Sequence, residues 1–541
     1  MNKETSLAAP EARNDVIPPP TKNQIEEAIK VINYFSDHET EYANKEQRPF
    51  RCALRLIFRR ELTKYFGGLS LDEYVAKQVG LHVHSSVTQH DRNLVNKSRL
   101  RSIRQQNMKE RQARNHKLEC LMVPDGPAQT TNEYTQTSND DNLPPDDQRT
   151  VYKSRRCYTC KRPHKQLHHF YDQLCVKCAD LNWRKRIQTA DLNGKMMLVT
   201  GGRMKIGFQT ALKLLRCGAN VIVTTRFPID AADRYSKEDD FQQWKDRLQI
   251  FGLDFRDIAS VERFCAHLCE TLDRLDAIIN NATQTVRKPV SHYQHLIDLN
   301  LRGRLTLTND AQSVVANVNG INPIAAVWAG RGDDDGLIGK SALQSQLCLT
   351  EEDHKIDDST KDTSLVDVHD RPVDLRSVNS WTLKLGEIAT AEVAEVFAIN
   401  TMAPFVFNSK LKPLLLKNRS SDSADHKFIV NVSAMEGKFS RYKTACHPHT
   451  NMAKAAVNMM TRTSAEDYAT QGIYMTSVDT GWINDEAPLH LAQRRTKQMD
   501  FQPPLDEIDA AARILDPIFV GYNDNRLIVG KFLKDYDETD W

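Results

Sequence analysis

The segment Met196–Gly207, with the sequence MMLVTGGRMKIG, decides the fold of this 541-residue chain. Its apolar first half predicts a short buried strand, and a glycine-rich turn follows directly. Such a turn between a strand and a helix lets backbone N–H groups and the helix N-terminus approach a pyrophosphate. The segment therefore predicts the first strand, turn and helix of a dinucleotide-binding α/β domain.

Three more apolar runs follow at the spacing of strands that alternate with helices. Arg226 follows the run 220–225, and Asp254 follows the run 249–253. Asn280, Asn281 and Ala282 follow the run 277–279. This alternation is typical of a parallel sheet with helices on both faces. We therefore expect an α/β fold, a Rossmann-type doubly wound parallel sheet.

From about residue 194 onward the chain resembles the short-chain dehydrogenase/reductase family. Residues 200–207 match the family's Thr-Gly-x-x-x-Gly-x-Gly loop except at Lys205, and residues 280–283 match Asn-Asn-Ala-Gly except at Thr283. Further landmarks follow in family order: the helix of Asn400, the strand 428–434, the helix 450–456 and the turn 478–481. The resemblance implies hydride transfer between a nicotinamide and an unknown carbonyl or alcohol. It also implies a homo-oligomer formed through the helices of the active site.

The expected cofactor is NADP(H), with NAD(H) as the alternative. An NAD-type family member carries an acid at the position of Thr225, whereas this chain has a neutral residue followed by Arg226, which suits a 2′-phosphate. Lys205 either points outward to bind phosphate or fills space that the cofactor needs. The resemblance implies cofactor contacts from Thr200, Gly201, Arg203, Ile206, Gly207, Arg226, Asp254, Asn281, Ala282 and Lys454.

The catalytic tyrosine of the family is replaced by Thr450. A threonine alcohol has a pKa of about 15–16 and cannot exchange protons as a phenol near 10 does. Asn400 and Lys454 match the family, whereas the family's serine falls at Ala434 and leaves Ser433 as its neighbour. The candidate catalytic set is Asn400, Ser433, His449, Thr450 and Lys454, with His447 and Tyr442 as further proton donors to consider.

The replacement leaves two classes of function open. One is an oxidoreductase with a degenerate catalytic tetrad, in which an imidazole such as His449 supplies the proton. The other is a catalytically inactive nucleotide-binding protein with a regulatory or scaffold role.

Two Cys-x-x-Cys pairs, separated by fourteen residues, precede this domain. Four thiolates bind zinc tetrahedrally, and so short a segment could not bury enough apolar surface to fold without the metal. We expect Cys157, Cys160, Cys175 and Cys178 to hold a structural zinc. A histidine (His164, His168 or His169) in place of one cysteine, and a reactive dithiol, are the alternatives.

The remaining sequence predicts a disordered tail (1–20), a helical module (21–120), a linker (121–150), the zinc module (151–186) and the dinucleotide domain (187–541), with an insertion at about 284–375. Thr21 and Gln24 form a predicted helix-capping box. Residues 92–117 carry nine Lys/Arg and one acid, which indicates a solvated basic helix or a contact with RNA or an acidic protein.

The overall charge does not favour binding to nucleic acid or to a membrane, because Lys+Arg 73 nearly balance Asp+Glu 71. No apolar run of about 18 residues exists, which argues against a membrane span. No secretory signal is recognisable at Met1, and the cysteine pattern suits a reducing compartment. We therefore expect a cytoplasmic protein, with the nucleus as the alternative.

Overall fold

The computed structural model describes residues 21–37, 83–120, 149–302, 307–316, 338–350, 353, 374–418, 425–440, 442–484, 486–489, 491–492 and 502–541. The chain divides into two units, Met1–His90 and Asp91–Trp541. The predicted tail, the helices expected within 38–82 and the linker from 121 to 148 lie outside the described residues. In the first unit, helix α1 (Lys22–Asp37) follows the predicted capping box. The Thr21 N–H donates to Gln24 Oε1 at 2.9 Å and the Gln24 N–H donates to Thr21 Oγ1 at 3.4 Å, which confirms it.

The second unit is built on an eight-stranded sheet in the order β10-β9-β8-β7-β6-β3-β4-β5. Every neighbouring pair is parallel except β10 and β9. The predicted Rossmann-type parallel sheet is therefore confirmed. The strands are β3 (Met196–Thr200), β4 (Asn220–Thr225), β5 (Leu248–Gly252), β6 (Ala277–Asn280), β7 (Lys427–Ser433), β8 (Ile473–Asp479), β9 (Phe532–Lys534) and β10 (Asp537–Thr539).

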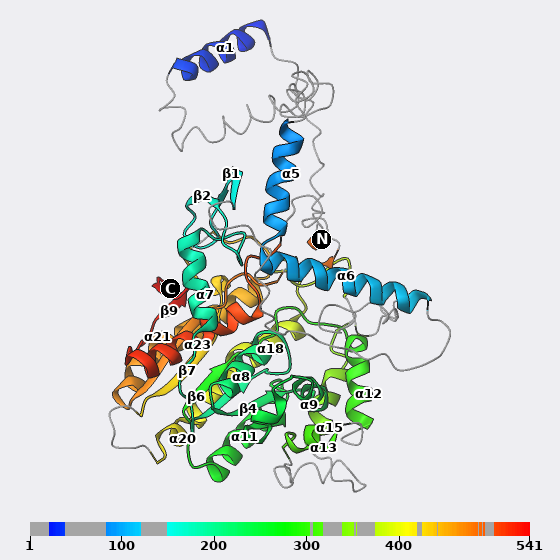
Figure 1. The fold of residues 1–541 in the computed structure, drawn as a ribbon, viewed down its shortest axis with the longest axis vertical. Coiled ribbons are helices and arrows are strands. Elements are labelled where there is room, and N and C mark those ends of the chain that lie inside the picture. The colour runs from blue at the N-terminus through cyan, green and yellow to red at the C-terminus, as the bar shows by residue number, and fades with distance from the viewer. Residues whose placement is uncertain are drawn as a thin grey trace, which may run out of the picture. The chain divides into compact units, whose positions relative to one another are not determined.

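Helices cover both faces of this sheet because its central strands are apolar on both sides, as in other parallel sheets. One core joins the sheet to α8 (Lys205–Arg216), α9 (Pro228–Ser236) and α23 (Glu507–Asp524). The other joins it to α11 (Ile258–Thr271), α19 (Ala403–Lys410) and α21 (Pro448–Thr470) (Figure 1). Because these strands run parallel, the polar residues predicted at their ends lie together at the carboxyl edge of the sheet.

The described part of the insertion gathers beside α9 and the ends of β4 and β5 (Figure 1). Its elements are η4 (Val290–Tyr293), α12 (Gln294–Arg302), α13 (Asn309–Ser313), α15 (Ile338–Leu343) and η6 (Gln344–Gln346). Phe227, which follows β4, packs with Leu296, Ile297 and Ala342 of these helices. The Ile250 N–H donates to the Val314 carbonyl at 2.8 Å, so the insertion also pairs with the outer edge of β5.

The cysteine-bearing segment folds as the hairpin β1 (Thr150–Arg156) and β2 (Pro163–Gln166), followed by α7 (Val176–Ile187). Its helix packs on α23. The predicted basic helix is two helices, α5 (Val83–Asn96) and α6 (Arg99–Cys120). Two of its arginines point inward: Arg101 is 2% exposed and meets Asp172, and Arg104 bonds to backbone carbonyls near residue 505.

Helices of the described residues are too short or too polar to cross a membrane.

Candidate active site

The glycine-rich turn has a shape that excludes side chains. Gly201 has φ of +69°, and a Cβ there would lie 2.8 Å from Ala282 Cα. A Cβ on Gly207 would lie 2.2 Å from the Gly201 carbonyl oxygen. No side chain caps the N-terminus of α8, so its first-turn N–H groups stay available to phosphate oxygens. This backbone cradle fits a dinucleotide pyrophosphate.

The turn is fixed to the neighbouring strand β6 by Thr200 and Asn281. Thr200 Oγ1 accepts the N–H groups of Asn281 and Ala282, each at 3.0 Å. The Asn281 side-chain amide donates to the Thr200 carbonyl at 3.0 Å. These predicted cofactor residues therefore lie together, at the carboxyl ends of β3 and β6, and hold the turn in shape.

Lys205 stands where the family has a glycine, and it adopts the backbone conformation of one, with φ of +53°. A left-handed conformation costs a non-glycine residue about 1–2 kcal/mol. The turn thus keeps its path despite the substitution. The next residue, Ile206, packs against the core beneath the helix.

The two predicted cofactor arginines differ in their surroundings. Arg203 donates to Asp230 at 2.5 Å; burial opposes ionisation of that carboxyl, but Arg203 and Arg234 hold its pKa below the usual value. Arg226 instead lies over the rings of Tyr293 and Phe227, at 4.6 and 5.4 Å. Among the described residues, no carboxylate lies within ion-pair distance of the Arg226 guanidinium. Arg226 is therefore the better placed of the two for an incoming phosphate.

Asp254, the remaining predicted residue of the adenosine end, is buried and already paired. Its carboxylate binds Arg256, with a shortest distance of 2.6 Å, and Arg256 also reaches Glu395 at 3.1 Å. A contact with the cofactor would have to share this carboxylate with Arg256.

Asn400 lies in a π-helical turn, Ala398–Met402, between α18 (Thr390–Phe397) and α19. Single π turns inside helices are frequent at functional sites. The Asn400 side chain accepts the Gln284 N–H at 2.7 Å and donates to the Gln284 carbonyl at 3.0 Å. This double contact fixes the amide 2% exposed at the carboxyl end of β6.

Lys454 and Ser433 converge on the end of β7. Lys454 Nζ donates to the Val432 carbonyl at 2.8 Å, and burial lowers the pKa of this lysine to about 8. The Ser433 hydroxyl is buried and forms no hydrogen bond within the described residues. Ala434 lies just beyond the strand, at the family's serine position.

Thr450 is buried and its nearest titratable neighbour is His449. Thr450 Oγ1 lies 3.5 Å from His449 Nε2, at the limit of a hydrogen bond, and the same nitrogen lies 3.9 Å from Glu392 Oε1. Burial lowers the pKa of His449 more than Glu392 raises it. Burial therefore favours the neutral form of this imidazole.

The other two proton donors considered from the sequence lie elsewhere. His447 stacks on Trp381 with ring centroids 4.0 Å apart, and its Nδ1 lies 2.9 Å from the Trp381 carbonyl oxygen. Tyr442 is 94% exposed. His449 is thus the histidine beside the threonine.

The four cysteines come together as predicted. Their sulfurs all lie within 4.8 Å of one another, and Cys160 Sγ and Cys175 Sγ are 3.7 Å apart. Sulfurs bound tetrahedrally at about 2.3 Å from zinc are separated by about 3.8 Å. Among the described residues no histidine joins this group: His164 Nδ1 contacts the Gln166 carbonyl and His168 accepts the Phe170 N–H. The donor set fits four-thiolate zinc.

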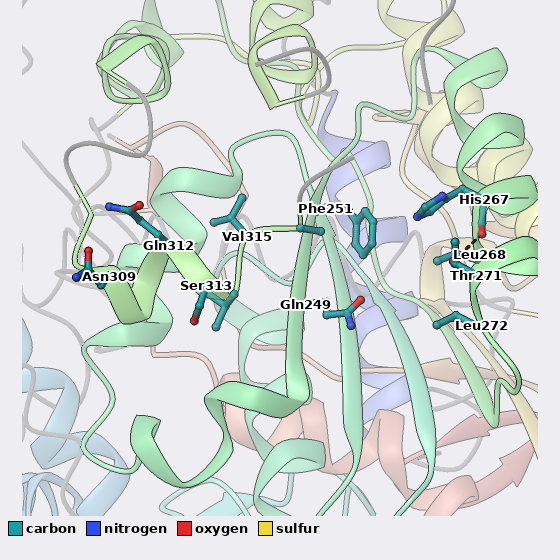
Figure 2. A pocket seen from close by; sticks show the side chains of 12 residues that line it. Gln249, Phe251, His267, Leu268, Thr271, Leu272, Asn309, Gln312, Ser313 and Val315 are labelled. Carbon is teal, nitrogen blue, oxygen red and sulfur yellow. Dashed lines mark hydrogen bonds between the residues drawn. The ribbon is translucent and has the colours of Figure 1, made fainter. Parts of the chain in front are cut away.

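A surface cavity of about 750 Å³ lies apart from these residues. Figure 2 shows its lining from β5, from the second half of α11 and from the segment 309–316. Gln249 and Leu272 place it toward the amino ends of the strands, whereas ligands of open α/β sheets bind at the carboxyl ends. It is not the candidate active site.

Three contact residues were not foreseen from the sequence: Glu392 beside His449, Tyr293 beside Arg226, and Tyr158, which accepts the Trp482 N–H at 2.9 Å. Tyr158 and Trp482 are 324 positions apart. No local pattern signals such contacts. Of the three, only Tyr293 lies in the predicted insertion at about 284–375.

A glycine cradle at the first strand of a parallel sheet, with a buried lysine and asparagine at the same edge, defines a dinucleotide-dependent oxidoreductase fold. A family model described as short chain dehydrogenase matches residues 195–320 and 377–495. The chain belongs to the short-chain dehydrogenase/reductase family. It is 31% identical over 378 residues to uncharacterized protein R665 of Acanthamoeba polyphaga mimivirus, covering 68% of this chain and 71% of that protein.

Other similarities are shorter or more distant. Retinol dehydrogenase 13 of Homo sapiens is 33% identical over 93 residues, which is 17% of this chain and 28% of that enzyme. Among solved structures, a Pseudomonas aeruginosa RhlG/NADP complex has 18% identity and a TM-score of 0.39, covering 63% of this chain and 95% of that one. A short chain dehydrogenase from Shigella flexneri has 17% identity and a TM-score of 0.39, covering 65% and 95%.

Proposed function

We propose that the protein interconverts an alcohol and a carbonyl compound with NADP(H) as the cofactor. The observation that carries the proposal is the backbone cradle of Gly201 and Gly207, together with the position of Arg226 at the end of β4. Within the described residues no carboxylate lies at ion-pair distance from this guanidinium, which suits the 2′-phosphate that distinguishes NADP(H) from NAD(H). The bound nicotinamide would supply or accept the hydride.

The protein's own residues bind and orient in this mechanism. The N–H groups at the start of α8 would bind the pyrophosphate, and Lys454 at the end of β7 would bind the nicotinamide ribose. Asn400, fixed by its two contacts with Gln284, would position a water or the substrate oxygen. These roles follow from the family match of each residue and from their common location at the carboxyl edge of the sheet.

Proton transfer falls to the Thr450–His449 pair. A threonine hydroxyl is too weak an acid to act alone, but it can pass a proton between the substrate oxygen and a neighbouring imidazole. Neutral His449 can accept the proton released by an alcohol, whereas reduction of a carbonyl needs the imidazolium form. Because the pKa of His449 is lowered, the pair favours alcohol oxidation at neutral pH.

This relay is tested by Thr450→Val and His449→Ala in an NADP(H)-linked screen of alcohols and carbonyls. Each variant is expected to lose about 100-fold or more of turnover, with NADP(H) affinity by intrinsic fluorescence unchanged. His267→Ala, on α11 beside the outer cavity, is the matched control. Turnover that survives both substitutions would refute the relay. NADP(H) binding without any turnover in the native protein would instead support a catalytically silent nucleotide-binding scaffold.

Zinc is the second component of the proposal, held by Cys157, Cys160, Cys175 and Cys178 as a structural ion. The four sulfurs fill a tetrahedral set, which leaves no position for substrate. Native protein should contain about one zinc per chain, and Cys175→Ser should release it. Metal analysis that finds no zinc, with all four thiols free to titrate, would contradict this assignment.

We also propose that the helices around the site form a homo-oligomer interface. Met402, Phe405, Met452 and Met459 are 49–60% exposed on the π turn, α19 and α21. Met452 and Met459 are seven positions apart and so share one face of α21. Phe405→Asp should lower the oligomeric mass in light scattering, and an unchanged mass would refute this surface.

A further inference from the structure

The cysteine-bearing segment carries a strong excess of positive charge. Residues 149–187 contain eleven Lys/Arg and two acids, Asp172 and Asp180, whereas Lys+Arg 73 nearly balance Asp+Glu 71 over the whole chain. A zinc ion held by four thiolates has a net charge of about −2, so the segment stays strongly positive when loaded. Such a local field attracts polyanions even where the net charge of the whole protein is near zero.

Part of this charge is compensated inside the protein. Lys185 and Arg186 of α7 bind carboxylates of α23. Arg155 of β1 meets Asp172 at 3.3 Å, and Arg101 of α6 shares that buried carboxylate at the same distance. These cations hold the segment to α23 and to α6.

A second set of cations, on the hairpin of β1 and β2, is exposed. Four side chains of this set form no ion pair within the described residues: Lys153, Arg156, Arg162 and Lys165. We call these four residues the hairpin cations. The nearby carboxylate of Asp91 is occupied by backbone, because it accepts the N–H groups of residues 152 and 153 at 2.8 and 2.9 Å.

Strand pairing places two of the hairpin cations on one face. Arg156 pairs with Pro163 across the hairpin, and opposite residues of an antiparallel pair share a face. Lys165 lies two positions beyond Pro163 and therefore faces the same side. Arg155, whose charge is compensated, pairs with His164 on the other face. The hairpin thus turns one face to the protein and presents cations on the opposite one.

An exposed aromatic ring accompanies the hairpin cations. Tyr152 of β1 is 60% exposed. Bases of a single strand stack on exposed aromatic rings, and neighbouring guanidinium and ammonium groups bind the phosphates. An acidic peptide would need the cations alone. The combination of ring and cations therefore favours a single-stranded nucleic acid over an acidic protein.

We propose that the β1–β2 hairpin binds single-stranded nucleic acid, with the hairpin cations on its phosphates and Tyr152 stacked on a base. The inference goes beyond the proposed oxidoreductase, because the hairpin is a separate two-stranded sheet and contributes no residue to the candidate active site. It also differs from the contact expected of residues 92–117, where Arg101 and Arg104 are turned inward.

The test measures the fluorescence anisotropy of labelled single strands of about 16 nucleotides, as RNA and as DNA, titrated with the full chain. The cation variant combines three substitutions: Arg156→Gln, Arg162→Gln and Lys165→Gln. The matched control removes the same charge from lysines that are 51–57% exposed on other elements: Lys237→Gln, Lys410→Gln and Lys531→Gln. Zinc content and thermal unfolding show that both variants keep the native fold.

We expect the cation variant to bind RNA or DNA at least about 10-fold more weakly than the control. Its slope of log K against log salt should be shallower by about 2, because three phosphate contacts are lost. Tyr152→Ala should lose about 10-fold in affinity, whereas Tyr152→Phe keeps the ring and should bind like the native protein.

Equal affinity of the cation variant and its control would overturn the proposal, and so would equal affinity of Tyr152→Ala and Tyr152→Phe. Native protein that binds neither strand would refute it as well. Tighter binding to a poly-Glu peptide than to either strand would assign the hairpin to an acidic protein instead. These titrations use neither NADP(H) nor turnover, so their result is independent of the proposed chemistry.

Discussion

The cofactor end and the proton-transfer end of this site depart from the family pattern to different degrees. At the cofactor end the turn keeps its shape even at Lys205, which adopts the left-handed backbone of the glycine that it replaces. At the proton-transfer end the frame of Asn400 and Lys454 remains, yet the phenol is gone and Thr450 stands beside His449. A site made of backbone N–H groups allows few alternatives, because contacts of 2–3 Å exclude side chains. A proton donor is replaceable by any group that reaches the same place.

The largest effect should follow from a methyl group in the cradle. Gly207→Ala places a Cβ 2.2 Å from the Gly201 carbonyl, so the loop must shift, and dinucleotide affinity should fall more than about 100-fold. Gly386→Ala is the control, since nothing lies within 4 Å of its added Cβ. Equal NADP(H) affinity of the two variants would show that the cradle does not bind phosphate.

Restoring the family's tyrosine and serine should return the proton-transfer end to the family pattern that the cofactor end has kept. Thr450→Tyr combined with Ala434→Ser is expected to raise NADPH-dependent carbonyl reduction about 100-fold, within the range of general acid catalysis. Thr450 is 3% exposed, so the added ring also displaces neighbours. Thr450→Phe with Ala434→Ser carries the same bulk without the hydroxyl, and a matching gain in that variant would contradict the explanation.

Cofactor preference is the next largest expected change. Arg226→Asp should lower NADP(H) affinity by about 10- to 100-fold and favour NAD(H), because one charge-assisted contact is worth roughly 1.5–3 kcal/mol. Arg226→Gln should lose the preference without gaining the new one. Competition titrations with both dinucleotides measure the ranking, and an unchanged ranking in Arg226→Asp would place the 2′-phosphate elsewhere.

The smallest effect concerns the pH dependence of Lys454. Its pKa is lowered to about 8, so the charge is present below pH 8 and is lost as pH rises through that value. Native NADP(H) affinity should fall several-fold between pH 7 and 9, whereas Lys454→Met should bind weakly at both. The folded state binds fewer protons than the unfolded state between about 8 and 10.5, so the buried charge costs stability below pH 8. Lys454→Met should therefore raise the unfolding free energy at pH 7, by roughly 2–3 kcal/mol in urea titrations; a decrease would contradict this sign.

The sequence predicts the sheet well because each strand is an apolar run bounded by polar or glycine residues. Residues 220–225 form β4 with the expected limits, and β5 is displaced by one residue. The cysteine cluster was equally predictable, since paired Cys-x-x-Cys turns have a local geometry. Both rest on interactions among near neighbours in the chain.

The side-chain environments were less predictable because distant segments create them. Arg203 and Arg226 both follow strands of the sheet, yet within the described residues only Arg203 forms an ion pair, with Asp230 of a helix 27 positions away. Adjacent helical residues normally face different directions, so the approach of His449 to Thr450 could not be expected from spacing alone. The roles predicted for these residues remain predictions until the variants above are measured.

The π turn at Ala398–Met402 has a consequence for how this site can change by mutation. A π turn holds one more residue than an α turn, so deletion of a single residue there would restore a continuous α-helix. The flanking helices would keep their orientation, because the wider turn absorbs the extra residue. The backbone at Asn400 would tighten, however, and its amide would leave its two contacts with Gln284. The position of this amide is thus tied to the residue count of the segment, so a deletion there should harm the site without unfolding the helix.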